Sequence, residues 1–266
     1  MEKIRIFVSG AAGKMGREVV KAVLADKELE LVGASDAKFH GTDVGQLVGL
    51  NTVGVELSGI LSSETLKASR AQVVIDFTNP QSVMKNCKIA LESGVHPVIG
   101  TTGLSEEEIA EIESIAKKFQ TGAFIAPNFA IGAILMMKFA QEAARYFPNV
   151  EIIELHHDQK LDAPSGTGLK TAEMIAAVRP VFTQGHVNEY EKIPGARGGD
   201  YQGLRIHSVR LPGLIAHQEV IFGGLGQALT IRHDAYSRET YMPGIMLAAK
   251  KVINLSGLVI GLENLL

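Results

Sequence analysis

Short apolar runs rich in β-branched residues alternate with helical patterns through the first half of the chain. The runs predict strands over 4–10, 29–36, 71–78, 95–102 and 122–128. Between them, apolar residues at helical spacing predict helices over 14–26, 81–93 and 105–119. Ser105 and Glu108 have the spacing of a capping box at the start of the last of these helices. The alternation predicts an α/β domain, in which a doubly wound and mostly parallel sheet carries helices on both faces.

The second half of the chain has a different pattern. Helices are predicted over 131–147, 166–178 and 238–255, and strands over 149–158, 204–211, 216–224 and 227–234. Short turns join the last three strands, which favours an antiparallel meander within an α+β domain. We therefore predict a first domain over 1–128, completed by the closing segment 239–266, and a second domain over 129–238. The polar, glycine-rich loop 183–203 is long enough to expect that it is functional or mobile.

Composition and charge limit the class of protein. The chain has 266 residues and a net charge of −3, which argues against a general binder of nucleic acid or membrane surfaces. Cys87 is the only cysteine, so an intrachain disulfide and a cysteine-rich metal site are excluded. The N-terminal residues run directly into a strand pattern, and no apolar run is long enough to span a membrane. We expect a cytoplasmic protein.

The turn between the first strand and the first helix carries three glycines, in the segment GAAGKMG. Gly10 permits a tight turn, Gly13 lets backbone N–H groups approach a pyrophosphate, and Gly16 lets the helix pack closely on the sheet. Asp36 lies 20 residues after Gly16, at the end of the second strand, where a carboxylate can accept from the ribose hydroxyls of NAD. These features favour a dinucleotide site over a plain strand-to-helix turn with a surface aspartate.

Other polar residues are expected at the same edge of the sheet. Lys14 and Lys38 lie near the glycine turn and Asp36 in sequence, and either could bind the 2′-phosphate of NADP or remain solvated. Thr101, Thr102 and Asn128 follow the ends of two further predicted strands. Ligands of doubly wound sheets bind outside the carboxyl ends of the strands, so these residues are candidate cofactor or substrate contacts, although turn chemistry also uses them.

The segment ELHHDQKLDAPSGTG, residues 154–168, is the most unusual of the chain. His156 and His157 end a predicted strand, so their side chains should point to opposite faces, which disfavours a shared metal ion. Lys160 and the N–H groups of Gly166 and Thr167, at the start of a helix, suit an anion such as a carboxylate. The simpler interpretation is a helix cap with two incidental histidines.

This segment closely resembles the signature of the dihydrodipicolinate reductase family, also called 4-hydroxy-tetrahydrodipicolinate reductases. The resemblance extends over the whole chain through GAAGKMG, VVIDFT, VIGTTG, APNFAIG and HDAYSR. It implies a Rossmann-like N-terminal domain, a C-terminal α+β domain that forms a homotetramer, and NADH or NADPH as cofactor. The implied activity is reduction of 4-hydroxy-tetrahydrodipicolinate in lysine and diaminopimelate biosynthesis, with hydride from the nicotinamide and a proton from the enzyme.

The resemblance also implies roles for individual residues. His156 and Lys160 are the implied proton donors, and His157, Gly166 and Thr167 the implied ligands of the dicarboxylate substrate. Asp36 lies where the family places its ribose-binding acid, and Lys38 stays a candidate contact of the cofactor from its place in the sequence. The remaining implied cofactor contacts are Gly10, Ala11, Ala12, Gly13, Lys14, Met15, Gly100, Thr101, Thr102, Ala126, Pro127, Asn128 and Phe129. Some family members carry arginine directly after the ribose-binding acid, whereas this chain has Ala37 followed by Lys38.

Two other functions would explain part of the sequence. An aspartate or homoserine dehydrogenase would account for residues 1–128 but not for the histidine segment. A regulatory protein that senses a nucleotide would need the glycine turn but no proton donor. The resemblance favours the reductase over both.

Overall fold

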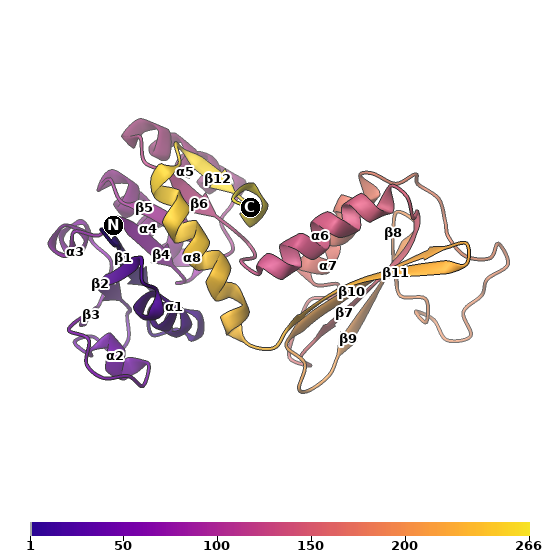
Figure 1. Ribbon diagram of the computed structural model, residues 1–266, viewed down its shortest axis with the longest axis horizontal. Coiled ribbons are helices and arrows are strands. Elements are labelled where there is room, and N and C mark those ends of the chain that lie inside the picture. Colours follow the sequence, from indigo (N-terminus) through magenta and orange to yellow (C-terminus); the bar gives the residue numbers. More distant parts are fainter. Residues whose placement is uncertain (1) are drawn as a thin grey trace. The chain divides into compact units, whose positions relative to one another are not determined.

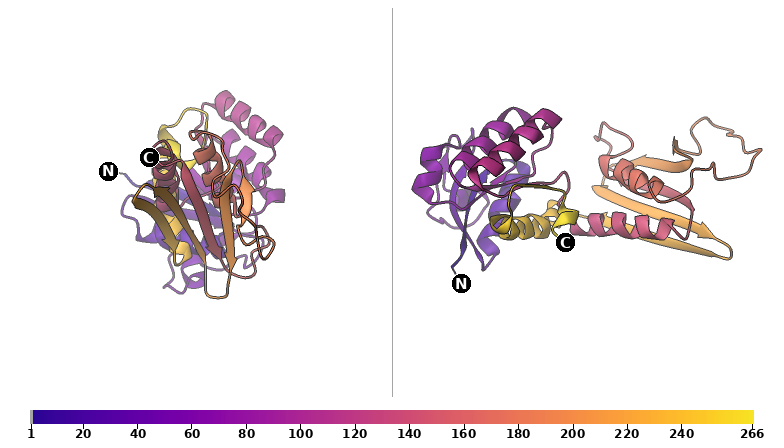
Figure 2. Two further views of the ribbon diagram at one scale, coloured as in Figure 1. Left: turned by 90° about the vertical axis from the view of Figure 1, so that its right-hand side faces the viewer. Right: turned by 90° about the horizontal axis from the view of Figure 1, so that it is seen from above.

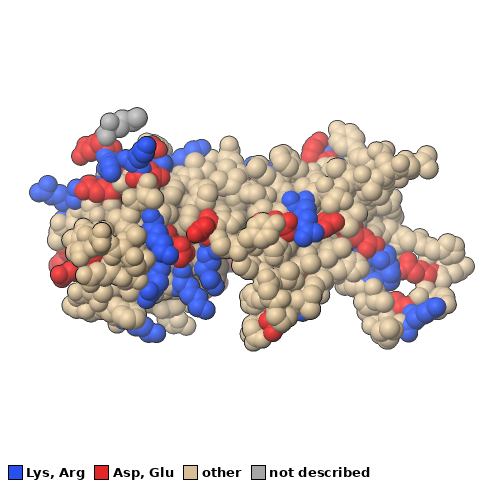
Figure 3. Space-filling view, turned by 60° about the horizontal axis from the view of Figure 1, so that its bottom comes forward, with Lys and Arg blue, Asp and Glu red and all other residues tan. Residues whose placement is uncertain are grey.

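A computed structural model describes residues 2–266 of the chain. These residues divide into two compact units, shown in Figure 1. Unit 1 comprises residues up to Ala130 together with Arg238–Leu266, and unit 2 comprises Ile131–Ser237. Among the helices of residues 2–266, none combines the length and the apolar character that crossing a membrane requires. Positive and negative side chains are interspersed on the face shown in Figure 3.

Unit 1 is built on a parallel sheet, as the alternating pattern predicts. Within the described residues the sheet has seven strands in the order β12-β6-β5-β4-β1-β2-β3. The strands are β1 (Ile4–Ser9), β2 (Leu29–Ser35), β3 (Leu57–Ser58), β4 (Val73–Asp76), β5 (His96–Ile99), β6 (Ala123–Ile125) and β12 (Leu258–Ile260). The strand order reverses between β1 and β4, which is where doubly wound sheets bind their ligands. The predicted Rossmann-like fold is confirmed.

Helices cover both faces of this sheet. They are α1 (Lys14–Ala25), α2 (Val44–Leu47), α3 (Ser63–Ser69), α4 (Pro80–Glu92), α5 (Glu106–Phe119) and α8 (Met242–Lys251). Helix α1 packs against α8, whereas α4 packs against α3 and α5. One core cluster lies between α4, α5 and the strands β5 and β6, and includes Ile99 and Ile112. Helix α5 begins with the predicted capping box, because Ser105 accepts from the Glu108 N–H and the Glu108 carboxylate accepts from the Ser105 N–H.

The closing segment is less regular than the single helix predicted over 238–255. A 3₁₀ turn over Arg238–Tyr241 precedes α8, and a second one over Val252–Asn254 follows it. Helix α8 has a proline in its first turn, where the missing N–H is not needed. The segment then adds β12 beside β6, a strand that the pattern does not predict.

Unit 2 is a five-stranded mixed sheet with two helices on one face, as Figures 1 and 2 show. The helices are α6 (Ile131–Ala144) and α7 (Gly166–Ala176). The strands are β7 (Asn149–His156), β8 (Gly199–Tyr201), β9 (Leu204–Arg210), β10 (Ala216–Gly224) and β11 (Gln227–Ala235). The order is β11-β10-β7-β9-β8, so β7 is the central strand.

The predicted meander of the last three strands is wrong. Strands β10 and β11 form an antiparallel hairpin, but β7 lies between β9 and β10. The short link after β9 passes the end of β7, where the Leu211 N–H donates to the His156 carbonyl at 3.1 Å. Strand β7 is buried on alternate residues, and pairing on both edges satisfies its backbone inside the sheet. A short connection therefore does not make two strands neighbours here.

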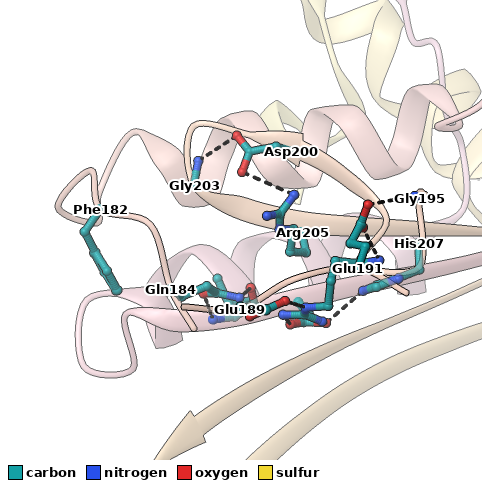
Figure 4. Close-up of polar contacts among 12 residues, drawn as sticks. Phe182, Gln184, Glu189, Glu191, Gly195, Asp200, Gly203, Arg205 and His207 are labelled. Carbon is teal, nitrogen blue, oxygen red and sulfur yellow. Dashed lines mark hydrogen bonds and ion pairs between the residues drawn. The ribbon is translucent and has the colours of Figure 1, made fainter. Parts of the chain in front are cut away.

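The long loop between α7 and β8 is tied to the sheet by charged residues (Figure 4). Arg197 contacts Glu189 and also Glu151 of β7, the latter with an N–O distance of 2.6 Å. The ring of His207 on β9 bonds the same Glu151 carboxylate at 2.7 Å. Burial raises the pKa of Glu151, but the hydrogen bonds from Arg197 and His207 outweigh it and lower that pKa below its ordinary value.

Candidate functional site

Two positions of the glycine turn after β1 can hold only glycine. Gly10 has φ +81°, and a Cβ there would lie 2.4 Å from the Phe77 carbonyl oxygen. A Cβ on Gly16 would lie 2.0 Å from the Gly10 carbonyl oxygen. The turn is therefore packed against the loop after β4 and against its own helix, and leaves the N-terminus of α1 accessible. This is the arrangement that a pyrophosphate requires.

A cavity of about 310 Å³ lies at the carboxyl ends of β1, β2 and β4. It brings together five of the predicted cofactor contacts, which are Gly10, Ala12, Gly13, Asp36 and Lys38. The other lining residues were not predicted from the sequence, and they are Ser9, Ser35, Ala37, residues 59–61 and 77–79, Ser82 and Asn86. The cavity lies at the reversal of strand order and combines backbone amides with a carboxylate. Its residues fit a dinucleotide.

Asp36 is held in place by the glycine turn that it accompanies. Its Oδ2 accepts from the Ala12 N–H at 3.0 Å, and its Oδ1 accepts from the Lys38 N–H at 2.9 Å. Each carboxylate oxygen can accept a second hydrogen bond, so Asp36 still has capacity for ribose hydroxyls. The Lys38 side chain is exposed, as is that of Lys14. Both lysine side chains that could contact a 2′-phosphate are thus accessible to a ligand in solution.

The remaining predicted cofactor contacts do not line this cavity. Residues 100–102 and 126–129 follow the neighbouring strands β5 and β6 at the same edge of the sheet. Thr101 is buried, and its hydroxyl donates to Asp76. The Phe129 ring lies 5.9 Å from that of Phe77, which connects the segment after β6 with the cavity wall. Ala11 is also buried, within the glycine turn.

The histidine segment of unit 2 is built around a residue that the sequence analysis did not single out. Glu154 on β7 has 0% of its side chain exposed, and its Oε2 lies 2.5 Å from Nδ1 of His156. A carboxylate only accepts, so the ring proton is on Nδ1 and points at Glu154. The other ring nitrogen, Nε2, is then the one that faces away from Glu154 and can exchange a proton with a ligand. Glu154 thus fixes the orientation and the tautomer of His156.

Arg210 on β9 pairs with the same carboxylate from the other side. Its Nη1 donates to Oε2 at 2.9 Å and its Nη2 to Oε1 at 2.7 Å, a bidentate arrangement. The Ser165 N–H is a second donor to Oε1, at 3.2 Å. The parallel register places Arg210 directly beside His156. Burial raises the pKa of Glu154, but hydrogen bonds from His156 and Arg210 outweigh it and lower the pKa to about 2.

The helix that follows starts beside these groups. The Ser165 hydroxyl caps α7 by accepting from the Gly168 N–H at 3.1 Å. A Cβ on Gly166 would meet nothing within 4 Å, so the first turn of α7 borders open space. Arg210 also donates to the Asp162 carbonyl at 2.8 Å, which ties the loop before α7 to the buried pair. The helix N-terminus, Arg210 and His156 therefore belong to one cluster.

The other two predicted residues of the segment lie in the loop. Strand β7 ends at His156, so His157 is outside the strand and exposed, and the expected alternation of the two side chains does not apply. The Lys160 Nζ lies 2.7 Å from Asp162 Oδ1. No group of three His, Cys, Asp or Glu side chains that could hold a metal ion occurs within residues 2–266.

The low pKa of Glu154 gives unit 2 a predicted dependence on acid. A carboxyl with a folded-state pKa of about 2 and an ordinary value of 4.5 contributes stability above pH 4.5 and loses it as the pH falls toward 2. The contribution is about 3 kcal/mol. Hydrogen exchange of β7 and β9 at decreasing pH should show this loss. Glu154→Gln, whose side chain cannot titrate, should be less stable at neutral pH, and its stability should not change between pH 4.5 and 2. An equal loss of stability with falling pH in the wild type and in Glu154→Gln would show that Glu154 is not the group responsible.

Two family models together match nearly the whole chain. A family model described as the N-terminus of dihydrodipicolinate reductase matches residues 4–129, and one described as the C-terminus matches residues 132–266. The 4-hydroxy-tetrahydrodipicolinate reductase of Desulfitobacterium hafniense is 68% identical over 266 residues, which is 100% of both chains. That of Syntrophomonas wolfei is 57% identical over 100% of this chain and 99% of its own.

A solved structure extends the match to the fold. The dipicolinate-bound dihydrodipicolinate reductase from Paenisporosarcina sp. TG-14 superimposes with a TM-score of 0.87 at 48% identity. The match covers 99% of this chain and 100% of that one. The resemblance found in the sequence is confirmed along its whole length, and this excludes the alternative of an aspartate or homoserine dehydrogenase. The chain belongs to the dihydrodipicolinate reductase family.

Proposed function

We propose that this chain reduces 4-hydroxy-tetrahydrodipicolinate to tetrahydrodipicolinate with NADH or NADPH, a step of lysine and diaminopimelate biosynthesis. The observation that carries the proposal is the 2.5 Å contact between His156 Nδ1 and the buried Glu154. A histidine that is oriented by a buried carboxylate, close to the start of a helix, is suited to general acid catalysis on an anionic substrate. A regulatory nucleotide sensor would need no such pair.

Unit 1 binds the cofactor in this proposal. Gly10–Met15 hold the pyrophosphate, and Asp36 accepts from the adenosine ribose. Segments 100–102 and 126–129 border the nicotinamide half. The bound nicotinamide supplies hydride to a conjugated carbon of the substrate ring. The contribution of unit 1 is orientation, because backbone amides and a fixed carboxylate hold the dinucleotide without taking part in the chemistry.

Unit 2 binds the dicarboxylate. The N–H groups of Gly166 and Thr167 and the positive end of α7 attract one carboxylate, and His157 and Lys160 add donors in the adjoining loop. The TG-14 structure supports this chemistry, because its ligand dipicolinate is a dicarboxylate. After hydride arrives, negative charge develops on the substrate, and His156 Nε2 gives up a proton to it. Glu154 stabilises the imidazolium that donates this proton.

The proposal is tested by following NADH or NADPH oxidation with substrate generated immediately before use. Oxidation that requires the substrate, at a rate well above the blank without enzyme, is the expected result. A chain that binds the cofactor but oxidises none of it in the presence of substrate would contradict the proposal.

We also propose that the protein works as a homotetramer in the cytoplasm, with unit 2 making the contacts between subunits. Sedimentation of the intact chain as a monomer at assay concentration would exclude the tetramer.

The enzyme is predicted to discriminate only weakly between NADH and NADPH. The Asp36 carboxylate favours NADH, because a 2′-phosphate would meet a negative charge. The exposed Lys38 and Lys14 offset this, and screening keeps each effect small. We expect kcat/KM for the two cofactors to agree within about tenfold, which is roughly 1.4 kcal/mol. Asp36→Ala should shift the ratio toward NADPH and Lys38→Ala toward NADH. Steady-state kinetics with both cofactors, on the wild type and the two variants, measure these ratios. A wild-type preference above a hundredfold, or shifts opposite to those expected in the variants, would show that other residues set the cofactor preference.

A further inference from the structure

A second buried carboxylate lies in unit 1, next to residues that line the cavity. Asp76, at the end of β4, has 2% of its surface exposed. Its Oδ1 accepts from the hydroxyls of Thr78 and Thr101, both at 2.7 Å, and from the Thr78 N–H at 3.1 Å. Its Oδ2 accepts from Asn86 Nδ2 at 2.8 Å. Burying a carboxylate is costly unless it is hydrogen-bonded, and four donors meet that requirement here.

The network around Asp76 joins the ends of neighbouring strands. Asn86 Nδ2 also lies 3.3 Å from the hydroxyl of Ser9 at the end of β1, and that oxygen is 3.3 Å from Ser35 Oγ at the end of β2. The Thr78 N–H donates to Thr101 Oγ1 at 2.8 Å, which connects the loops after β4 and β5. Ser9, Ser35, Thr78 and Asn86 all line the cavity. Asp76 therefore orders side chains that a bound cofactor would touch.

The direction of these hydrogen bonds restricts what Thr78 can offer to a ligand. A hydroxyl has one proton, and a carboxylate only accepts, so the Thr78 proton is directed at Asp76. The Thr78 oxygen keeps lone pairs, and Thr78 is one of the residues that line the cavity. It can accept from an N–H or O–H of a ligand, but it cannot donate to a phosphate. Thr78 is thus unsuited to the pyrophosphate and suited to a donor group.

The position of Thr78 indicates which donor it meets. A doubly wound sheet binds each nucleoside of a dinucleotide on one half, and the half that starts with β1 and β2 holds Asp36. Thr78 and Thr101 follow β4 and β5, which belong to the other half. The donors available on the nicotinamide nucleoside are its ribose hydroxyls and its carboxamide N–H₂ group.

We propose that Asp76 is a positioning residue that makes the Thr78 hydroxyl an obligate hydrogen-bond acceptor for the nicotinamide nucleoside. This inference rests on the proposed function only in that the chain must bind NADH or NADPH. It assigns to the buried carboxylate a role in orienting the reduced nicotinamide, through Thr78 and without contact of its own. A chain that binds NADH in this way but fails to reduce the proposed substrate would refute the proposed function and leave this inference intact.

The first test compares Thr78→Val, which keeps the shape and removes the acceptor, with Thr78→Ser, which keeps the hydroxyl. Calorimetric titration measures the Kd for NADH and, as control ligand, for ADP, which lacks the nicotinamide nucleoside. Loss of one hydrogen bond should weaken NADH roughly fivefold to tenfold in the valine variant. ADP binding should stay unchanged, and serine should restore NADH binding. Wild-type NADH affinity in the valine variant, or an equal loss for ADP, would overturn the proposal.

The second test asks whether Asp76 acts through Thr78. Asp76→Asn removes the charge, and a turned Asn86 amide can still pair with the new side chain. It should weaken NADH severalfold, and the double variant with Thr78→Val should bind no more weakly than Thr78→Val alone. Additive losses would show that Asp76 does not work through this hydroxyl. If Asp76→Asn fails to fold, the Thr78 variants still test the acceptor on which the proposal depends, and an unchanged NADH affinity in Thr78→Val still overturns it. The acetylpyridine analogue of NADH, which lacks the carboxamide N–H₂, identifies the donor. If the carboxamide is the donor, Thr78→Val should bind this analogue as tightly as the wild type does. If a ribose hydroxyl is the donor, Thr78→Val should still bind the analogue more weakly.

Discussion

Replacing His156 with alanine is expected to lower kcat by roughly 10²–10⁴-fold, the range of a positioned general acid. The reason is the 2.5 Å contact to Glu154, which fixes Nε2 as the nitrogen that exchanges a proton. Binding of dipicolinate and of NADH should change little, since the proposed contacts to both are made by groups other than the His156 ring. Steady-state kinetics and calorimetry on the purified variant measure both effects.

His157→Ala is the matched control for this variant. His157 is the next residue, is exposed and has left the strand, so it lacks the buried carboxylate that orients its neighbour. Its removal should raise KM for the substrate more than it lowers kcat, because a binding contact is lost and the acid remains. Turnover at the wild-type level in folded His156→Ala would remove His156 from the proposed chemistry.

The second large effect is expected from Glu154→Ala. The substitution leaves the Arg210 guanidinium, whose side chain is 18% exposed, without its carboxylate partner. Breaking a buried ion pair from one side costs about 3–5 kcal/mol. The chain has two units, so a single unfolding free energy is poorly defined, and hydrogen exchange localised to β7 and β9 is the better measurement. The free energy of opening of these strands should fall by about that amount.

A double variant separates stability from catalysis at this site. Glu154→Leu with Arg210→Met replaces both charges by apolar groups of similar size, a change that is often neutral or stabilising. We expect exchange protection to return to near the wild-type level while kcat stays as low as in Glu154→Ala, because His156 loses its orienting carboxylate. Recovery of turnover together with stability would mean that Glu154 only holds the fold.

Much of unit 1 could be predicted from the sequence because its signals are local. Most of its strands are short apolar runs, and helices α1, α4 and α5 begin at the glycine turn or at a side-chain cap. Gly10 and Gly16 stand where only glycine fits. The elements that were missed, such as β3 and β12, have two or three residues and carry no periodic signal. Strand β12 forms because β6 offers an unpaired edge, which is a tertiary effect.

The site in unit 2 shows where local reasoning stops. Glu154 could have been found, since it lies two residues before His156 and therefore on the same face of the strand. Arg210 could not, because its place beside His156 depends on the parallel register of β7 and β9, and the turn lengths indicated a different neighbour. The charge pair that orients the candidate acid is thus a product of strand order.

The central claim is that this chain transfers hydride from a nicotinamide cofactor to the ring of 4-hydroxy-tetrahydrodipicolinate. The most direct measurement uses NADH that carries deuterium at the transferred position, with substrate generated in the same vessel, and mass spectrometry of the product. The account predicts tetrahydrodipicolinate with one deuterium for each cofactor oxidised. Oxidation of the cofactor without deuterium in the product, or no product from folded enzyme, would contradict it.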